Sequence, residues 1–152
     1  MAGPVREAVH QDPVWRERSN FVLAATIAGN SEISTEQLWG RQIDAFRFEI
    51  CCIPFFVSDL ALGDIVETDD SYLVSRVVQP SGRYVFRIWF GESFQPRDEV
   101  VNELTALGAL TEWSSPNLLG VDATDRKHAQ VIADFLDARE RAGQLLYETG
   151  RS

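Results

Sequence analysis

The sequence is short of the residues that build catalytic and metal sites. Its 152 residues include two histidines and two cysteines, and the cysteines are adjacent, at Cys51 and Cys52. Adjacent cysteines give no disulfide framework, and they form no zinc site unless the fold brings ligands from elsewhere. Glycine-rich phosphate-binding patterns are also missing, so Gly63 and Gly82 are interpreted as turn residues. We therefore expect no cofactor and no metal.

Long apolar runs are missing as well. No run approaches the roughly 18 residues of a membrane span. The N-terminus also lacks the apolar stretch of a secretory signal. Together with the absence of a disulfide framework, this predicts a soluble, cytoplasmic protein that makes no membrane contact.

Positive charge is scarce. The chain has 14 Lys and Arg against 23 Asp and Glu, which gives a formal net charge of −9. A field of this sign repels nucleic acids and attracts basic partners, although ordinary solubility also explains the excess of acids. We expect no nucleic-acid binding.

The length of the chain predicts one domain. A chain of this size buries roughly 70% of its unfolded surface, enough for a core of its own. Residues 1–18 mix prolines and charges without a period, which indicates a flexible N-terminal arm. Residues 19–152 are then a single α+β domain.

The stretch Leu62–Phe90 predicts three consecutive antiparallel strands. Turn residues cluster at Asp69–Ser71 and at Pro80–Arg83, and the intervening segments alternate. The third strand carries large side chains on both faces: Tyr84, Phe86, Ile88 and Phe90 on one, and Val85, Arg87 and Trp89 on the other. Such a strand is expected to be central and covered twice.

Three helices are predicted around this meander. Ser34-Thr35-Glu36-Gln37 fits a capping box and predicts a short helix. A second helix follows Pro96 and stops at Gly108, and the longest covers about Asp125–Glu148.

Strands are predicted at Asn20–Ala28 and Ala45–Ile53, and a hairpin joins Leu110–Ser114 to Leu118–Ala123. The segment Tyr84–Glu148 thus has the order β-α-β-β-α of a ferredoxin-like split β-α-β sandwich. The predicted fold class is α+β, an antiparallel sheet meander packed with three helices.

Several short motifs are similar to those of a known family. They are Glu36-x-Leu38-Trp39, Ile53-Pro54-Phe55-Phe56, Leu62-Gly63-Asp64-Ile65-Val66, Ser81-Gly82, Arg87, Leu107-Gly108, the strand Leu118–Ala123 and Tyr147-Glu148-x-Gly150. In these the chain resembles, from about residue 20 onward, the bacterial family of domains of unknown function numbered 4265. That family carries no established activity, so the resemblance implies architecture and no chemistry.

Candidate catalytic groups are few, and each has a structural alternative. His128 in the first turn of the last helix is either a neutral base or a solvated histidine. Cys51 and Cys52 point to opposite faces of a strand, as an exposed thiol or as buried filler. A hydrolase or transferase that uses Cys51/Cys52 or Asp64 with His128 would need folding to bring these groups together. Acids near Asp69 lack the spacing of a calcium loop and are read as a solvated turn.

The binding hypothesis rests on Pro54, Phe55, Phe56, Asp64 and Arg87. Pro54-Phe55-Phe56 after a strand is either a core plug or an exposed apolar lip for a partner. Asp64 and Arg87 are either a structural pair that locks adjacent strands or a polar patch beside that lip.

The function expected from these features is that of a non-enzymatic intracellular module which binds a protein partner, and the acidic net charge favours a basic one. An immunity-type protein that neutralises a toxin is one concrete version, by analogy with acidic proteins that occlude basic active sites. The alternatives are the small enzyme described above and a homodimer subunit with Phe55 and Phe56 buried across a two-fold axis.

Overall fold

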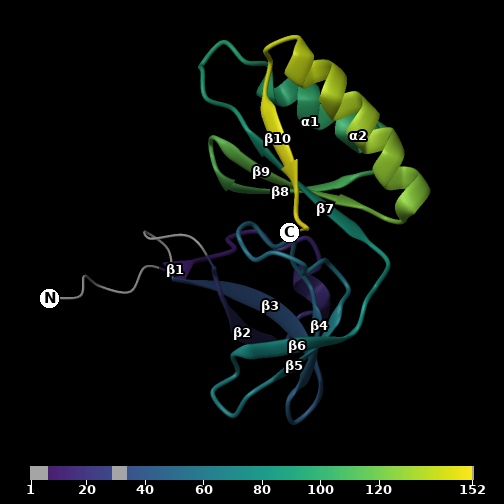
Figure 1. The fold of residues 1–152 in the computed structure, drawn as a ribbon. Helices are drawn as coiled ribbons and strands as arrows, with labels where there is room; N and C mark the ends of the chain where they lie inside the picture. The colour runs from purple at the N-terminus through teal and green to yellow at the C-terminus, as the bar shows by residue number, and fades with distance from the viewer. Residues whose placement is uncertain (1–6, 29–33, 152) are drawn as a thin grey trace, which may run out of the picture.

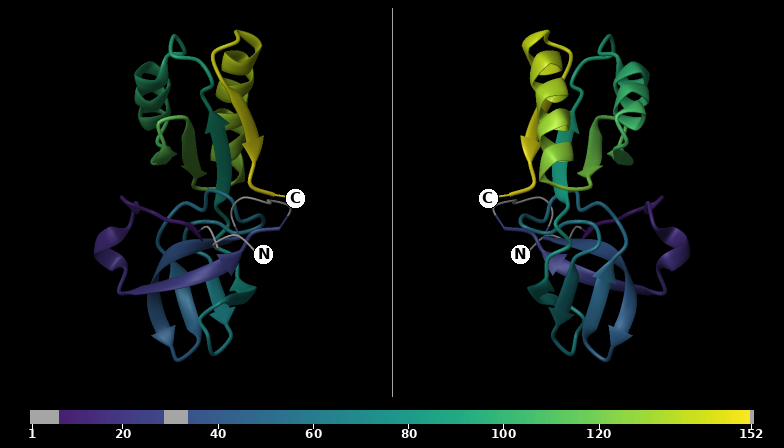
Figure 2. Two further views of the ribbon diagram at one scale, coloured as in Figure 1. Left: turned by 90° about the vertical axis from the view of Figure 1, so that its left-hand side faces the viewer. Right: turned by 90° about the vertical axis from the view of Figure 1, so that its right-hand side faces the viewer.

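The structure, a computed structural model, describes residues 7–28 and 34–151. These residues form two sheets, one above the other, and both helices lie on the upper sheet (Figure 1). Side views show the helices side by side, with the lower sheet below them (Figure 2). Within the described residues, no helix is both long enough and apolar enough to span a membrane.

The lower sheet curls into a small barrel. Its strands are β1 (Glu7–Ala8), β2 (Phe21–Thr26), β3 (Thr35–Asp44), β4 (Arg47–Ile50), β5 (Ile65–Thr68) and β6 (Val74–Gln79). They follow the order β1-β3-β4-β5-β6, and β2 pairs with β3. The backbone N–H of Ala24 in β2 donates to the carbonyl of Tyr72, 3.0 Å away, which brings β2 against the chain entering β6. We call β1–β6 the barrel; its buried core is Leu23, Ala25, Leu38, Phe48, Ile50, Cys52, Leu60 and Val66.

The upper sheet and the two helices form a two-layer sandwich. Its elements are β7 (Tyr84–Trp89), α1 (Arg97–Ala106), β8 (Leu110–Ser115), β9 (Leu118–Ala123), α2 (Arg126–Arg141) and β10 (Leu146–Thr149). The antiparallel sheet has the order β10-β7-β9-β8. With β10 added, the predicted β-α-β-β-α becomes β-α-β-β-α-β, the complete order of a split β-α-β sandwich. We call β7–β10 with α1 and α2 the sandwich.

Strand β7 holds the two halves together because both of its faces are buried. Phe86 and Ile88 pack against the helices in the core of the sandwich. Val85, on the other face, packs with Ile53 and Ala61 at the junction with the barrel. The prediction that this strand is covered on both faces is confirmed.

The predicted three-stranded meander is wrong in its last strand. β5 and β6 pair antiparallel as expected, but β7 pairs with β9 and β10 in the upper sheet. The turn Pro80–Arg83 therefore carries the chain from one half to the other. A strand with two apolar faces needs a neighbouring strand on each edge and cover on each side, which the sandwich provides and the edge of the barrel does not.

The prediction of three helices is also wrong, since the described residues contain two α-helices and a single 3-10 turn, Arg16–Arg18. The capping-box segment begins strand β3, in which buried Glu36 and Leu38 alternate with half-buried neighbours. The last helix ends at Arg141, and Gly143 adopts a φ of +73° just before the chain returns as β10.

The flexible arm predicted for residues 1–18 is wrong for residues 7–18. Glu7–Ala8 pairs with β3 as β1, and His10 is only 4% exposed. Val14 packs against the junction cluster of Ile53 and Ala61. The rest of the predicted arm, residues 1–6, lies outside the described residues.

Candidate functional site

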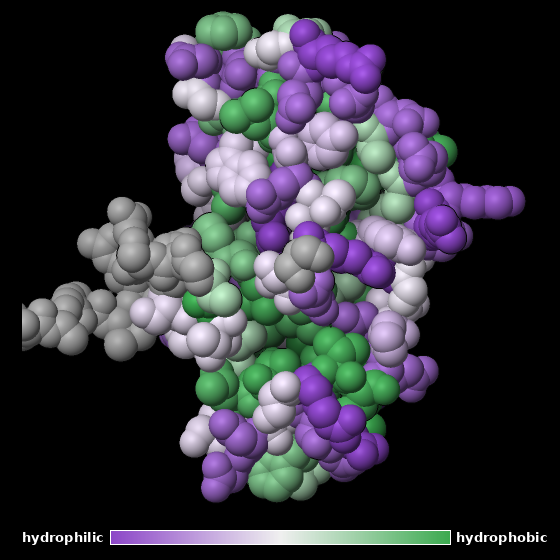
Figure 3. Space-filling model, viewed as in Figure 1, coloured by the Kyte–Doolittle hydropathy of each residue, from purple (hydrophilic) through white to green (hydrophobic). Residues whose placement is uncertain are grey.

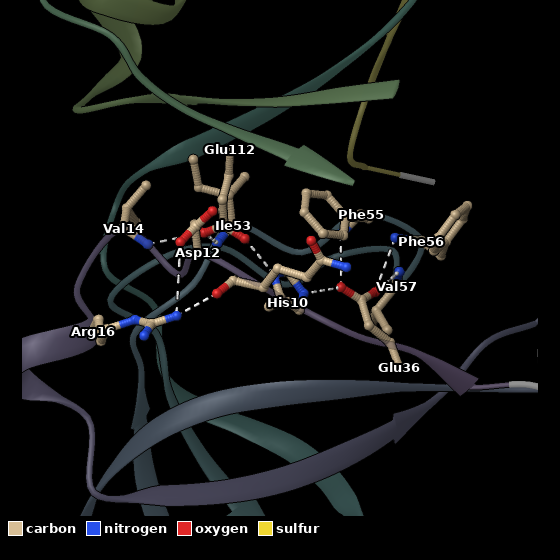
Figure 4. Close-up of polar contacts among 11 residues, drawn as sticks. His10, Asp12, Val14, Arg16, Glu36, Ile53, Phe55, Phe56, Val57 and Glu112 are labelled. Carbon is tan, nitrogen blue, oxygen red and sulfur yellow. Dashed lines mark hydrogen bonds and ion pairs between the residues drawn. The ribbon is translucent and has the colours of Figure 1, made fainter. Parts of the chain in front are cut away.

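Three charged side chains are buried together where the barrel meets the sandwich. Glu36 comes from β3 of the barrel, Glu112 from β8 of the sandwich, and His10 from the segment that follows β1. Figure 4 shows the His10 ring lying between the two carboxylates. Their side chains are 0–1% exposed, so all three are closed off from solvent. We call His10, Glu36 and Glu112 the charge cluster.

Both nitrogens of the His10 ring face a carboxylate. Nε2 lies 2.6 Å from Oε2 of Glu36, and Nδ1 contacts Oε2 of Glu112. Because an ionised carboxylate only accepts hydrogen bonds, this geometry requires a proton on both ring nitrogens. The ring also stacks on Phe55, with centroids 4.1 Å apart and an interplanar angle of 10°. His10 is therefore a buried imidazolium held on two edges and one face.

Backbone N–H groups satisfy the rest of the Glu36 carboxylate. It accepts hydrogen bonds from the N–H groups of Phe55, Phe56 and Val57 at 2.8, 2.9 and 3.1 Å. Three consecutive N–H groups aimed at one carboxylate form a concave anion site. The apolar segment after Pro54 is thus fixed by an acid from β3.

Glu112 is satisfied in the same way from the opposite side. Its Oε1 accepts from the N–H of Val14 at 3.0 Å and from the N–H of Ile53 at 3.1 Å. One side chain of the sandwich thereby ties down both the N-terminal segment and the chain that leaves the barrel. Pairing and hydrogen bonding of this kind offset much of the free-energy cost of removing these charges from water.

The pKa of His10 is set by opposing causes. Burial lowers it, the Cys52 thiol and its hydrogen bond raise it, and the hydrogen bonds to Glu112 and Glu36 raise it further, so that the pKa reaches about 12. Burial raises the pKa of Cys52 in turn, against the lowering effect of the His10 charge. The two carboxylates contact both ring nitrogens and hold the protons there.

Four of the five residues of the binding hypothesis are buried, so these residues do not form one exposed surface. Pro54 and Phe55 are buried, Phe55 completely, and Phe56 is half-buried. Phe55 therefore plugs the junction and forms no exposed lip. Asp64 accepts from the N–H groups of Ala61 and Ser81, at 2.9 and 2.8 Å, and shapes the local turns.

Arg87 is buried beside the cluster, and no contact between described residues pairs it with Asp64. Its Nη2 donates to the carbonyl of Val57 at 2.5 Å, and its Nη1 lies 3.6 Å from Glu148. Burial lowers the pKa of Arg87, while the charges of Glu36 and Glu148 oppose that change. The arginine links β7 to the Val57 turn and to β10.

The candidate catalytic groups are kept apart. Cys51 and Cys52 are buried. The His128 ring accepts from the N–H of Thr124 at 2.9 Å and contacts the carbonyl of Leu107 at 2.7 Å. In the part of the chain that the structure describes, no contact joins His128 to either cysteine or to Asp64, and no group of three or more His, Cys, Asp or Glu side chains is placed to hold a metal ion.

A surface pocket of about 200 Å³ opens at the junction, and Asp64, Arg83 and Arg151 are among its lining residues. Arg83 bonds the buried Asp122 carboxylate at 2.6 Å and lies over the Trp15 ring. Burial raises the pKa of Asp122 to about 6 against the lowering effect of Arg83. Arg83 at the pocket is therefore held in an ion pair with Asp122.

The sequence gives little indication of the charge cluster. His10 lies in a segment without a period, and Glu112 lies in a strand whose alternation is only partly apolar. Glu36 left one usable signal, because it shares a strand face with Leu38 in the alternation of β3. An acid in phase with apolar residues marks a buried carboxylate that needs a partner.

Comparison with known proteins supports the fold and adds no activity. The family model described as "Domain of unknown function (DUF4265)" matches residues 36–147. A solved structure described as the "Novel crystal structure of a hypothetical protein from Neisseria gonorrhoeae" is similar, with a TM-score of 0.71 and 24% sequence identity over 87% of this chain and 96% of that one. No curated protein matches the chain. The structural likeness concerns the fold alone.

Proposed function

Because the chain belongs to the DUF4265 family, whose description names no activity, we propose from its geometry that it is a non-enzymatic module that binds a basic protein partner. The location proposed for it is the cytoplasm, and the proposal includes neither nucleic acid nor a membrane surface as a partner.

One observation carries the proposal: the buried ionisable side chains at the junction contact one another and are closed to solvent. His10, Glu36 and Glu112 form a closed cluster with side chains 0–1% exposed. Substrate needs access to a catalytic group, and perturbed ionisable groups also arise in structural ion-pair networks. The cluster therefore supports a structural role, and the separation of His128 from the cysteines supports a protein that acts through its surface.

The negative net charge of the protein favours a basic partner. The formal net charge is −9, and hydrophilic residues cover much of the sandwich in the space-filling view, whereas hydrophobic residues gather over the barrel (Figure 3). Complementary charge speeds encounter and selects partners. A toxin with a basic active site is one concrete partner of this kind, and the protein would then act as its immunity protein.

The homodimer alternative has less support. It placed Phe55 and Phe56 across a two-fold axis, but Phe55 is fully buried within one chain. Only the half-buried Phe56 remains for that role.

Affinity capture followed by measurement with a purified partner tests the proposal. The tagged full chain is used to capture proteins from its source cells, in parallel with an unrelated protein of equal net charge. We expect a basic protein that only this chain retains. After purification it should bind with a Kd that rises steeply with salt. Failure to retain any protein beyond those on the acidic control would refute the proposed function.

A further inference from the structure

The two most exposed large hydrophobic side chains of the described residues lie at one end of the sandwich. Phe94 is 77% exposed and Leu146 is 65% exposed. Phe94 belongs to the loop between β7 and α1, and Leu146 begins β10, opposite Trp89 of β7. Both segments lie at the end of the sandwich remote from the barrel (Figure 1). We call residues 91–95 and 143–146 the tip.

Arg97 braces the first segment of the tip. Its guanidinium donates to the carbonyls of Glu92 at 2.9 Å and Phe90 at 3.2 Å. It also donates to the carbonyl of Pro116 at 3.0 Å and to the side chain of Asn117 at 2.9 Å. The loop that presents Phe94 is therefore fixed to the turn between β8 and β9.

Gln95 joins the two segments of the tip. Its Oε1 accepts from the N–H groups of Gly91 at 2.7 Å and Glu92 at 3.2 Å. Its Nε2 donates to the carbonyl of Gly143 at 3.2 Å, in the segment that leads to Leu146. The exposed side chains Phe94 and Leu146 are thus carried by segments that are hydrogen-bonded to each other.

The bracing gives two exposed apolar side chains a defined position. A side chain that is 77% exposed adds little to the protein's own core, and apolar groups gathered on a surface mark interaction sites. A backbone that is already ordered loses less conformational entropy on binding, and aromatic anchors with few rotatable bonds dominate interface energies. Phe94 has the properties of a preorganised anchor.

The exposed charges beside the tip that have no ion-pair partner among the described residues are negative. Glu92 and Asp98 are exposed, and neither belongs to any ion pair among the described residues. The nearby cations are already engaged: Arg97 is half-exposed and donates to four backbone carbonyls around it. Arg139 pairs with Glu99 and Glu103, and Arg141 pairs with Asp137. A partner surface that meets the tip with basic side chains around an apolar recess therefore matches it in both charge and polarity.

We propose that the tip is the surface that docks the partner, with Phe94 inserted into an apolar recess edged by lysine or arginine side chains of that protein. This inference rests on the proposed function and specifies the part of the surface that carries it.

Site-specific crosslinking locates the partner on the surface. The photoreactive residue p-benzoylphenylalanine is placed at position 94 and, as a control, at position 131, because Val131 is also exposed, at 48%, but lies on α2. We expect the captured partner to crosslink from position 94 and not from position 131. Crosslinking from 131 alone would overturn the assignment.

Binding measurements with the purified partner complete the test. Phe94→Ser should raise the Kd at least tenfold, since truncating an interface anchor commonly has an effect of this size. Glu92→Lys should raise the Kd and flatten its salt dependence, and Val131→Ser should change neither. Because Phe94 is exposed, unchanged urea unfolding will show that the variants fold. A partner that binds Phe94→Ser with the wild-type Kd would overturn the tip assignment alone, whereas a wild type without any partner would refute the proposed function together with it.

Discussion

The His10 imidazole stacks on the Phe55 ring, with centroids 4.1 Å apart and planes 10° apart, and this contact closes the junction between barrel and sandwich. The same ring bridges Glu36 of the barrel and Glu112 of the sandwich. A segment at the start of the chain therefore supplies the cation that allows two acids, one from each half, to be buried close together. Without that cation, two carboxylates would face each other in the protein interior.

His10→Ala should destabilise the protein by about 3–5 kcal/mol, because it leaves two buried carboxylates without their counter-ion. Urea unfolding at pH 7 measures the loss. Asp12→Ala is the matched control in the same segment, since the Asp12 side chain is 96% exposed and its contact with Arg16 is 3.7 Å long. This control should change the free energy of unfolding by less than about 0.5 kcal/mol.

A second substitution separates charge from packing at this site. Glu112→Gln should be less destabilising in the His10→Ala background than in the wild type, since it then removes a carboxylate that has lost its partner. Equal costs in both backgrounds, or a His10→Ala variant as stable as Asp12→Ala, would show that the cluster does not stabilise the junction.

Gly120→Ala should destabilise the protein by about 1–3 kcal/mol, the usual cost of overpacking. A Cβ at position 120 would lie 3.0 Å from the Cγ2 of Ile53 and 3.3 Å from the Phe55 ring, so that β9 and the Phe55 plug would be forced apart. Gly91→Ala is the control, because no atom lies within 4 Å of a Cβ built there. The measurement is the urea midpoint of each variant, and equal midpoints would mean that the junction is loosely packed.

The sequence predicts individual strands of this fold better than their partners. The large side chains on both faces of Tyr84–Trp89 correctly indicate a strand covered twice, and the hairpin of Leu110–Ser115 with Leu118–Ala123 forms as expected. A turn such as Pro80–Arg83 suits a hairpin, but it equally suits a passage between two sheets. The pairing of β7 with β10 joins segments nearly 60 residues apart, so local sequence carries no signal for it.

Contacts between distant segments also determine the candidate site, and local sequence does not indicate them. Local rules favour a helix at Ser34–Gln37, but burying Glu36 opposite His10 and the N–H groups after Pro54 stabilises the extended form. The sequence does not decide whether Phe55 is a core plug or an exposed lip, because its neighbours, His10 and Gly120, come from distant parts of the chain. Polar contacts between remote segments leave no periodic pattern.

Stability should fall as pH rises above neutrality, and His10 should be the cause. Its folded-state pKa is raised from 6.5 to about 12, so its contribution is complete below about pH 6.5 and is lost as pH rises towards the folded value. Between about pH 7 and about pH 8.5 the free energy of unfolding should drop by up to about 1.4 kcal/mol per pH unit. The contribution of Asp122, whose pKa is raised from 3.8 to about 6, is already lost below this window. The cysteine thiols have an ordinary pKa of 9.0 and titrate mainly above it. Urea unfolding across the window should give a slope in the wild type that is absent in His10→Ala, and the His10 ring should show an imidazolium NMR signal throughout; a flat wild-type profile would mean that His10 is neutral in the folded protein.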